Sequence, residues 1–370
     1  MKKILITLIA LTLLTGCGFF DQSDKQTTPP TVKNETKTTK KKNSLDDCYL
    51  YYYEQLSKDE KEIYESIYDC VINHDDKTEI GSSDMETISN ITSYVLYDHP
   101  EIFYLNYFEL QNQVKVCYYI PKYSYTKEET SSLKSQIETV RDNFISSLDQ
   151  NSSDYDKLKE IYNFVINKCT YVENAKDNQH LTSSLLYGDT VCSGYVKAVQ
   201  YLCQAVDIKC SYIVGKALDD SQDINHAWNL IYLDNDYYYL DATWGDYVDQ
   251  NDSFAMYAYF MFDSNDMLKL YQPISKYHDT KSGEYCYFNH EGLYNNSYNL
   301  NELKKQVSLY RNNNIEWMEF KFDDASYQSA KNRLINQQEM FDLYSSYTTG
   351  SYSVQYLYLD TLNVLIFKLL

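Results

Sequence analysis

Residues 191–195, which read Val-Cys-Ser-Gly-Tyr, open the stretch that decides the fold; residues 225–229 (Asn-His-Ala-Trp-Asn) and 240–244 (Leu-Asp-Ala-Thr-Trp) complete it. The apolar positions after the first block recur at helical spacing, at Tyr195, Val199, Leu202, Cys203 and Val206. Cys192 is therefore expected in the first turn of a helix. There, free backbone N–H groups and the helix dipole lower the pKa of a thiol from its usual ~8.5 and favour the nucleophilic thiolate.

Residues 226–233 and 237–243 predict two strands, because they are rich in Tyr, Leu, Ile and Trp and are separated by Asp234-Asn235-Asp236. A two-residue turn at Asp234-Asn235 places Asp241 opposite Trp228, with His226 as a diagonal neighbour on the same face. A turn at Asn235-Asp236 keeps this parity, whereas a three-residue turn would separate His226 from Asp241. Diagonal neighbours lie about 7–8 Å apart, so an imidazole and a carboxylate can meet.

These placements predict a catalytic triad in which Cys192 is the nucleophile, His226 the base and Asp241 the group that orients the base. The backbone N–H of Cys192 is expected to stabilise an oxyanion together with one upstream side chain. Three side chains are candidates for that second donor: Gln179, His180 and Ser184. Three aromatic residues are candidates for substrate contact, with core packing as the alternative: Tyr195, Trp228 and Trp244.

The three blocks resemble the transglutaminase-like superfamily, specifically its compact bacterial branch. That family has a Val-Cys-x-Gly-Tyr block, a His-Ala-Trp-Asn block and an Asp-x-Thr-Trp block, which residues 191–195, 226–229 and 241–244 match residue by residue. Asp189-Thr190 departs from the pattern, because Gly or Lys often precedes the Val-Cys pair. The resemblance covers less than half of the chain. It implies a papain-like Cys-His-Asp triad and a helix bearing the cysteine, packed on an antiparallel sheet that bears the histidine and the aspartate.

Residues 1–17 are predicted to be a lipoprotein signal peptide. Lys2 and Lys3 precede a short apolar run, and Leu14-Thr15-Gly16-Cys17 resembles a bacterial lipobox in which Cys17 becomes lipidated. The alternative is an ordinary secretory signal. Residues 18–44 are predicted to be a disordered linker, because their polar composition cannot form a core. We therefore expect an extracytoplasmic protein, anchored to a bacterial cell membrane by lipid.

The rest of the chain is predicted to form three modules: an N-terminal α/β module (45–125), a catalytic domain (126–280) and a C-terminal α+β module (281–370). The predicted fold class is thus α+β, a papain-like transglutaminase core flanked by small N- and C-terminal α/β modules. The helices expected from periodicity lie at 126–148, 154–169, 303–310 and 330–344. The further strands expected lie at 102–107, 114–120, 209–218, 285–288, 315–322, 353–359 and 363–369.

The net charge of −20 argues against a nucleic-acid partner, because phosphate binding requires a basic surface. Nine cysteines are present, and setting aside Cys17 and Cys192 leaves an odd number without any C-x-x-C pair. This pattern argues against a zinc site and against an obligatory disulfide. Cys70, Cys169 and Cys203 fall on apolar helix faces and are expected to be buried thiols. We expect neither a metal nor a cofactor.

Two classes of function are compatible with these patterns. The first is a transglutaminase-like cysteine acyltransferase or cysteine peptidase/amidase. It would act on a protein or cell-wall peptide through a Cys192 thioester, which an amine resolves as a crosslink and water resolves as hydrolysis. The second is a non-catalytic surface adhesion or assembly module that retains the fold. The ordered cysteine, histidine and aspartate favour the enzyme, because a scaffold has no physical need for that trio.

Overall fold

The computed structural model describes residues 49–113, 116–218, 223–248, 253–345 and 352–370. These residues fall into two compact units, divided between Thr130 and Ser131. The predicted signal peptide and the whole of the predicted linker lie outside the described residues. Within the described residues, no helix is both long enough and apolar enough to cross a bilayer.

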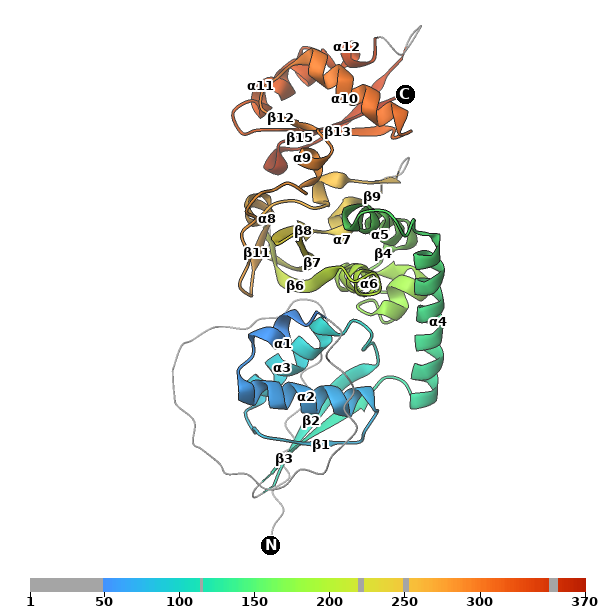
Figure 1. Ribbon diagram of the computed structural model, residues 1–370, viewed down its shortest axis with the longest axis vertical. Helices are drawn as coiled ribbons and strands as arrows, with labels where there is room; N and C mark the ends of the chain where they lie inside the picture. Colours follow the sequence, from blue (N-terminus) through green and yellow to red (C-terminus); the bar gives the residue numbers. More distant parts are fainter. Residues whose placement is uncertain (1–48, 114–115, 219–222, 249–252, 346–351) are drawn as a thin grey trace. The chain divides into compact units, whose positions relative to one another are not determined.

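The first unit is an α/β module. Three helices accompany an antiparallel sheet of order β1-β3-β2 (Figure 1). Its elements are α1 (Tyr51–Gln55), α2 (Lys58–Ile72), β1 (Thr78–Ile80), α3 (Met85–Asp98), β2 (Leu105–Asn112) and β3 (Cys117–Tyr123). Ser57 and Glu60 form a complete capping box at the start of α2. The helix α1 is capped instead from a distance, because the Asp98 carboxylate accepts hydrogen bonds from the backbone N–H groups of Tyr52 and Tyr53.

Both strands expected in this unit begin three residues late. β2 starts at Leu105 rather than at residue 102, and β3 starts at Cys117 rather than at residue 114. Ile102, Phe103 and Tyr104 are buried, but they form the irregular segment that follows Pro100. Their apolar character reflects burial in the core rather than strand pairing. Val114 itself lies outside the described residues.

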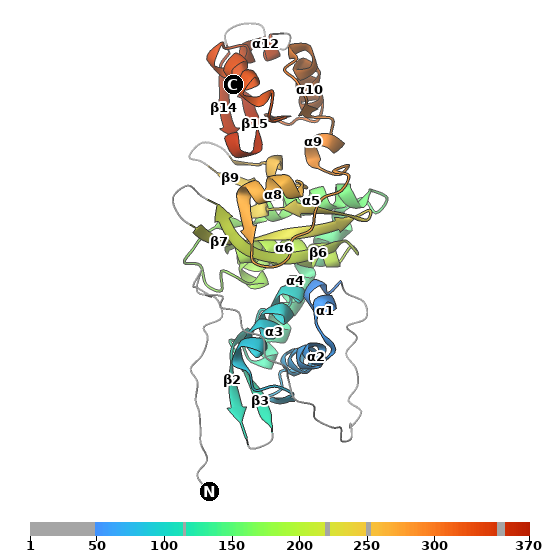
Figure 2. The ribbon, with the colours of Figure 1, turned by 90° about the vertical axis from the view of Figure 1, so that its left-hand side faces the viewer.

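The second unit contains the helix and sheet that the family pattern predicts. Its central antiparallel sheet has the order β11-β6-β7-β8, and α6 packs on β6 and β7 (Figures 1 and 2). The main elements are α4 (Lys127–Ser147), α5 (Asp154–Lys168), α6 (Cys192–Gln204), β6 (Lys209–Leu218), β7 (Asp223–Leu233), β8 (Asp236–Leu240), α8 (Ser264–Leu270) and β11 (Tyr271–Pro273). The short ones are β4 (Thr170–Tyr171), η1 (Thr182–Tyr187), β5 (Asp189–Thr190), α7 (Ala242–Gly245), β9 (Asp246–Val248), β10 (Ser253–Ala255) and η2 (Tyr257–Tyr259). The predicted fold class is confirmed.

The hairpin between β7 and β8 has the two-residue turn considered first. Asp234 and Asn235 have φ values of 47° and 63°, and Leu233 pairs with Asp236 across the turn. Two consecutive left-handed residues twist in the same sense as the strands, which favours this turn in hairpins. The predicted strand at 237–243 was too long, however. β8 ends at Leu240, because the Asp241 side chain accepts hydrogen bonds from the N–H groups of Thr243 and Trp244 and so caps α7.

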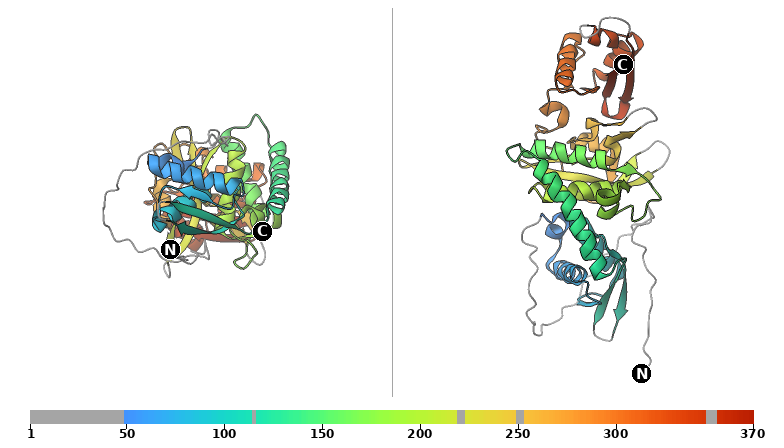
Figure 3. Two further views of the ribbon diagram at one scale, coloured as in Figure 1. Left: turned by 90° about the horizontal axis from the view of Figure 1, so that it is seen from below. Right: turned by 90° about the vertical axis from the view of Figure 1, so that its right-hand side faces the viewer.

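The C-terminal part of the second unit is an α+β module. Its sheet has the order β12-β13-β15-β14, with β12 parallel to β13 and the other pairs antiparallel, and α10 lies beside it (Figure 3). Its elements are α9 (Tyr287–His290), β12 (Tyr294–Asn295), α10 (Leu300–Asn312), β13 (Trp317–Phe322), α11 (Tyr327–Lys331), η3 (Asn332–Asn336), α12 (Met340–Tyr344), β14 (Val354–Leu359), η4 (Asp360–Leu362) and β15 (Val364–Leu369). Three of the four strands expected in this region are present.

Two expectations for this region were wrong. Residues 287–290 form the short helix α9 instead of a strand, because Tyr287 is buried with its ring stacked on Tyr257 and its N–H bonded to Met261. The helix expected at 330–344 is divided into α11, η3 and α12. Gln338, with φ of 62°, lies between the last two of these, and a left-handed residue cannot continue an α-helix.

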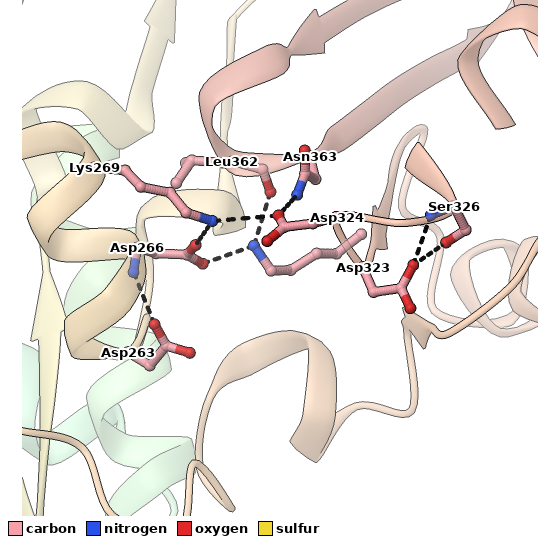
Figure 4. A network of polar contacts seen from close by, with 9 residues as sticks. Asp263, Asp266, Lys269, Asp323, Asp324, Ser326, Leu362 and Asn363 are labelled. Atoms are coloured by element: carbon pink, nitrogen blue, oxygen red, sulfur yellow. Dashed lines mark hydrogen bonds and ion pairs between the residues drawn. The ribbon is translucent and has the colours of Figure 1, made fainter. Parts of the chain in front are cut away.

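A partly buried ion-pair network joins this module to α8 of the transglutaminase-like core (Figure 4). Lys321 of β13 donates to Asp266 of α8 at 2.6 Å and to the carbonyl of Leu362 at 2.8 Å. Lys269 lies 3.2 Å from the other oxygen of the same aspartate. Because Asp266 is buried, removal of Lys321 would leave its charge poorly compensated, so the network is expected to resist separation of module and core.

Candidate active site

Cys192 is the first residue of α6, in the first-turn position that the sequence predicts. The preceding loop is held against this turn, because the carbonyl of Asn178 accepts hydrogen bonds from Val191 N at 3.0 Å and from Thr190 Oγ1 at 2.6 Å. Gly194 permits this close approach, since a Cβ at that position would overlap Thr190 Oγ1. The glycine of the family's first block therefore has a packing role beside the cysteine.

His226 lies on β7 and Asp241 lies directly after β8. The last recorded pair of the ladder is Asn229 with Leu240, so the next pair in register would be Trp228 with Asp241. This places His226 diagonal to Asp241 on one face, as the parity argument required. The structure thus brings together all three residues of the predicted triad, from α6, β7 and the end of β8.

The His226 ring lies between the other two residues. Its Nε2 is 2.6 Å from Asp241 Oδ2, and its ring is also hydrogen-bonded to the Cys192 thiol. Because Nε2 faces the aspartate, Nδ1 is the ring nitrogen left for the sulfur. Asp241 is fully buried, His226 is 7% exposed and Cys192 is partly exposed. Exposure therefore increases toward the sulfur, which is the atom that a substrate must reach.

Electrostatics favour a charged imidazole. Burial tends to lower the pKa of His226, but the carboxylate of Asp241 and the thiol of Cys192 outweigh it and raise the pKa from 6.5 to about 10. The ring is then an imidazolium at neutral pH. The Cys192 side chain therefore lies beside a positively charged ring.

Tyr271 is a member of the site that the sequence analysis missed. Its hydroxyl donates to Asp241 Oδ2 at 2.6 Å, and its ring stacks on Trp228 at 4.5 Å between centroids. Burial and the Asp241 carboxylate raise the pKa of Tyr271 well above its usual value, so it remains a neutral donor. No local pattern in the sequence marks residue 271 as part of the site.

The three aromatic candidates for substrate contact differ in exposure. Tyr195 is fully buried, with its hydroxyl 2.6 Å from Asp246 Oδ2. Trp228 is also fully buried. Trp244 is partly exposed, and its ring centroid lies 5.3 Å from that of His226. Of the three, Trp244 is the one that lies beside the predicted triad and is also partly exposed to solvent.

The three candidates for the second oxyanion donor differ in their burial and in the groups around them. Ser184 is fully buried, and its hydroxyl faces the carbonyls of His180 and Leu181. Burial, with the positive Lys197 nearby, lowers the pKa of His180 to about 3, so its ring is neutral, and its Nδ1 atom is buried. Gln179 is partly exposed and follows Asn178 in the loop tied to the start of α6.

The described residues contain no cluster of three or more metal-ligating side chains. The seven cysteines among them are free, and six of these are buried: Cys70, Cys117, Cys169, Cys203, Cys210 and Cys286. Cys192 is the exception, with part of its surface accessible.

Comparison with known proteins agrees with this arrangement. Residues 142–242 match the model of the transglutaminase-like superfamily, and this range contains Cys192, His226 and Asp241. The chain therefore carries a transglutaminase-like domain, and the resemblance read from its sequence is confirmed.

Individual relatives are distant. The kyphoscoliosis peptidase of Mus musculus is 26% identical over 137 residues, which cover 33% of this chain and 20% of that protein. Its Homo sapiens counterpart is 25% identical over 118 residues, covering 28% and 18%. The chain thus spans about a fifth of the curated relatives that it matches.

Two solved structures show local similarity. A candidate cysteine protease from Cytophaga hutchinsonii has a TM-score of 0.27 and 16% identity, over 38% of this chain and 56% of its own. A structure described as a TGase has a TM-score of 0.28 and 18% identity, over 40% and 46%.

Proposed function

We propose that this protein is a cysteine acyltransferase or hydrolase that acts through a thioester on Cys192. The observation that carries the proposal is the hydrogen-bonded series Cys192–His226–Asp241, assembled from three separate elements. The match to the transglutaminase-like superfamily supports cysteine-based acyl transfer or proteolysis in general.

In the first half of the reaction, the Cys192 thiolate attacks the carbonyl carbon of a carboxamide or peptide bond. The backbone N–H of Cys192, in the first turn of α6, faces the oxygen that becomes negative, and Gln179 is our choice for the second donor. The imidazolium of His226 gives its proton to the departing nitrogen. Ammonia or an amine leaves, and a thioester remains.

In the second half, an acceptor attacks the thioester and His226 takes its proton, so that the Cys192 thiolate is expelled. A primary amine as acceptor gives an isopeptide crosslink, and water gives hydrolysis. The triad is the same for both outcomes, and the choice depends on how well the site excludes water. Throughout the cycle, Asp241 keeps Nε2 protonated and the ring oriented.

We further propose that the reaction takes place outside the cytoplasm, on a protein or a cell-wall peptide. The lipobox-like Leu14-Thr15-Gly16-Cys17 supports a lipid anchor on Cys17, and the acidic net charge of −20 favours a substrate that presents amines. Residues 1–17 lie outside the described part of the chain, so this proposal depends on the sequence pattern.

Thiol alkylation tests the catalytic assignment. Purified protein is treated with iodoacetamide at pH 6, and each cysteine is quantified by peptide mass spectrometry. We expect Cys192 to react fastest, since the buried cysteines are shielded and burial raises the pKa of, for example, Cys169 to about 12. His226→Ala should abolish this selectivity, and Cys192→Ala supplies the blank.

Equal labelling of Cys192 and the buried thiols would contradict the proposal and favour a scaffold that only retains the fold. The acceptor is assigned separately, by incubation of candidate proteins with a fluorescent primary amine. Covalent incorporation of the amine indicates a transferase, and release of ammonia or of new peptide termini indicates a hydrolase.

A further inference from the structure

One oxygen of Asp241 receives two hydrogen bonds from side chains on different strands. His226 Nε2 and Tyr271 Oη each lie 2.6 Å from Asp241 Oδ2. The other oxygen, Oδ1, accepts from the backbone N–H groups of Thr243 and Trp244 at 2.9 Å and 3.1 Å. The buried carboxylate therefore has four donors, and Tyr271 is the one whose hydroxyl can be removed without changing the backbone or the imidazole.

The sheet is built so that Tyr271 can reach this point. Tyr271 pairs with Ala217 of β6, and Gly215, two residues back on the same face, pairs with His226. A Cβ on Gly215 would lie 2.5 Å from Trp228 Cη2, closer than side-chain atoms approach. The missing side chain leaves room for the Trp228 ring, on which the Tyr271 ring stacks.

The phenol is fixed in this orientation on several sides. Tyr271 is 1% exposed, and its ring centroid lies 4.5 Å from that of Trp228, 5.5 Å from that of His226 and 5.2 Å from that of Trp244. A residue packed in this way cannot turn its hydroxyl to solvent. The hydrogen bond to Asp241 is therefore a constant part of the site.

We propose that Tyr271 is a positioning residue for the acyl-transfer centre, whose hydroxyl both orients the Asp241 carboxylate and draws off part of its negative charge. This inference rests on the proposed function for its chemical meaning. A carboxylate with less charge stabilises the imidazolium less strongly, so Nδ1, on the ring side away from Asp241, releases its proton more readily to the departing nitrogen. Tyr271 thus limits how strongly Asp241 stabilises the imidazolium, and so how tightly Nδ1 holds the proton that the reaction must move.

Three other titratable groups interact with Asp241 or His226. Tyr162 of α5 and Tyr259 of η2 interact electrostatically with Asp241, and burial raises the pKa of both phenols, which keeps them neutral. Cys192 of α6 faces His226 from the opposite side. Among these groups, Tyr271 is the one with a recorded side-chain hydrogen bond to Asp241 besides His226 itself.

The test measures the titration of His226 directly by NMR on the full-length protein with ¹³C-labelled histidine. The chain has six histidines, and the His226 signal is the one lost in His226→Gln. Tyr271→Phe keeps the stacked ring and removes the hydroxyl. We expect the titration midpoint of His226 to rise by about one pH unit, the size expected for the loss of one hydrogen bond to an ionised group.

Two controls separate positioning from general packing. Tyr310→Phe removes an equally buried hydroxyl, bonded at 2.6 Å to the carbonyl of Glu319, and should leave the His226 midpoint unchanged. In an Asp241→Asn background, Tyr271→Phe should no longer move the midpoint, because the tyrosine acts through the aspartate. An unchanged midpoint for a folded Tyr271→Phe, verified by near-ultraviolet circular dichroism, would overturn the inference.

The inference and the proposed function fail in different ways. If Cys192 proves unreactive while the His226 midpoint still shifts, the proposed chemistry is wrong and the coupling between Tyr271 and Asp241 stands. If Cys192 is selectively alkylated but the midpoint does not move, Tyr271 has only a packing role.

Discussion

The Glu319 carboxylate, on β13 of the C-terminal module, accepts a hydrogen bond from the backbone N–H of Tyr257 at 2.6 Å. Its second oxygen accepts from Ala258 N at 2.8 Å, so both donors come from the start of η2. The carbonyl of Tyr259, at the end of the same turn, accepts from Asp241 N at 2.9 Å. The C-terminal module is therefore connected, through one turn, to the backbone of Asp241.

Glu319 is expected to make stability fall as pH rises. Burial raises the pKa of its carboxyl from 4.5 to about 8, although the two backbone N–H groups oppose the shift. The folded state therefore binds more protons than the unfolded state between these values, and the free energy of unfolding decreases across that window. Melting temperatures from pH 4.5 to 8.5 should decline in the wild type and be flatter in Glu319→Gln.

The matched control is Glu316→Gln, which makes the same chemical change three residues earlier at an exposed side chain paired with Lys368. It should leave the pH dependence unchanged. At pH 5, Glu319→Gln should lower stability by about 1–2 kcal/mol, because an amide can accept from one N–H group but not from both. Identical pH slopes in Glu319→Gln and the wild type would show that Glu319 does not titrate in this range.

Asp241→Asn should reduce the alkylation rate of Cys192 at pH 6 by about 10²-fold without abolishing it, because papain-like enzymes operate with a neutral amide in this place. Asp241→Ala should cost more activity and also lower the melting temperature. It removes the acceptor of Tyr271 and of the two N–H groups in α7, and buried donors without acceptors are costly. Rates and melting temperatures measured on the same samples separate the two effects; unchanged reactivity in Asp241→Ala would remove Asp241 from the triad.

Gly215→Ala should destabilise the protein by about 1–3 kcal/mol, the usual range for adding a methyl group to a tightly packed core. The new Cβ would lie 2.5 Å from Trp228 and 2.8 Å from the Pro273 backbone, so β11 or the indole must move. Urea denaturation measures the change. Gly81→Ala is the control, since no atom lies within 4 Å of its Cβ position. Equal stability of both variants would show that the sheet can relax at Gly215 without cost.

Cys17→Ser tests the proposed lipid anchor. In a bacterial host that processes lipoproteins, the wild type should label with a radioactive fatty acid and fractionate with membranes. The variant should lose the label, and either leave the membrane fraction or retain an uncleaved signal segment. Cys192→Ser, which also removes one thiol, should retain both label and location. A lipid label that persists in Cys17→Ser would contradict the assignment.

The sequence by itself determined the central layer of the fold, because the signals for that layer are local. The apolar periodicities of α4 and α5 and the alternation of β6 each lie within one element, and each of these elements appears within a residue of where the pattern placed it. The turn at Asp234-Asn235 set the register that brings His226 diagonal to Asp241. Side-chain parity along two strands joined by a short turn is a local property. The sequence alone therefore predicts that His226 and Asp241 lie on the same face of the sheet.

Tertiary structure alone decided which distant groups complete the site. Tyr271 lies thirty positions beyond Asp241, and it becomes a donor to Asp241 because β11 pairs with β6 in the sheet that carries His226. Tyr287 became helical because its ring and amide are bound by Tyr257 and Met261, which overrides a short apolar run typical of a strand. Glu319 became a buried anchor because the turn at Tyr257 offers two N–H groups to it. Contacts of this kind depend on which surfaces meet after folding, and no period or motif within a single segment encodes them.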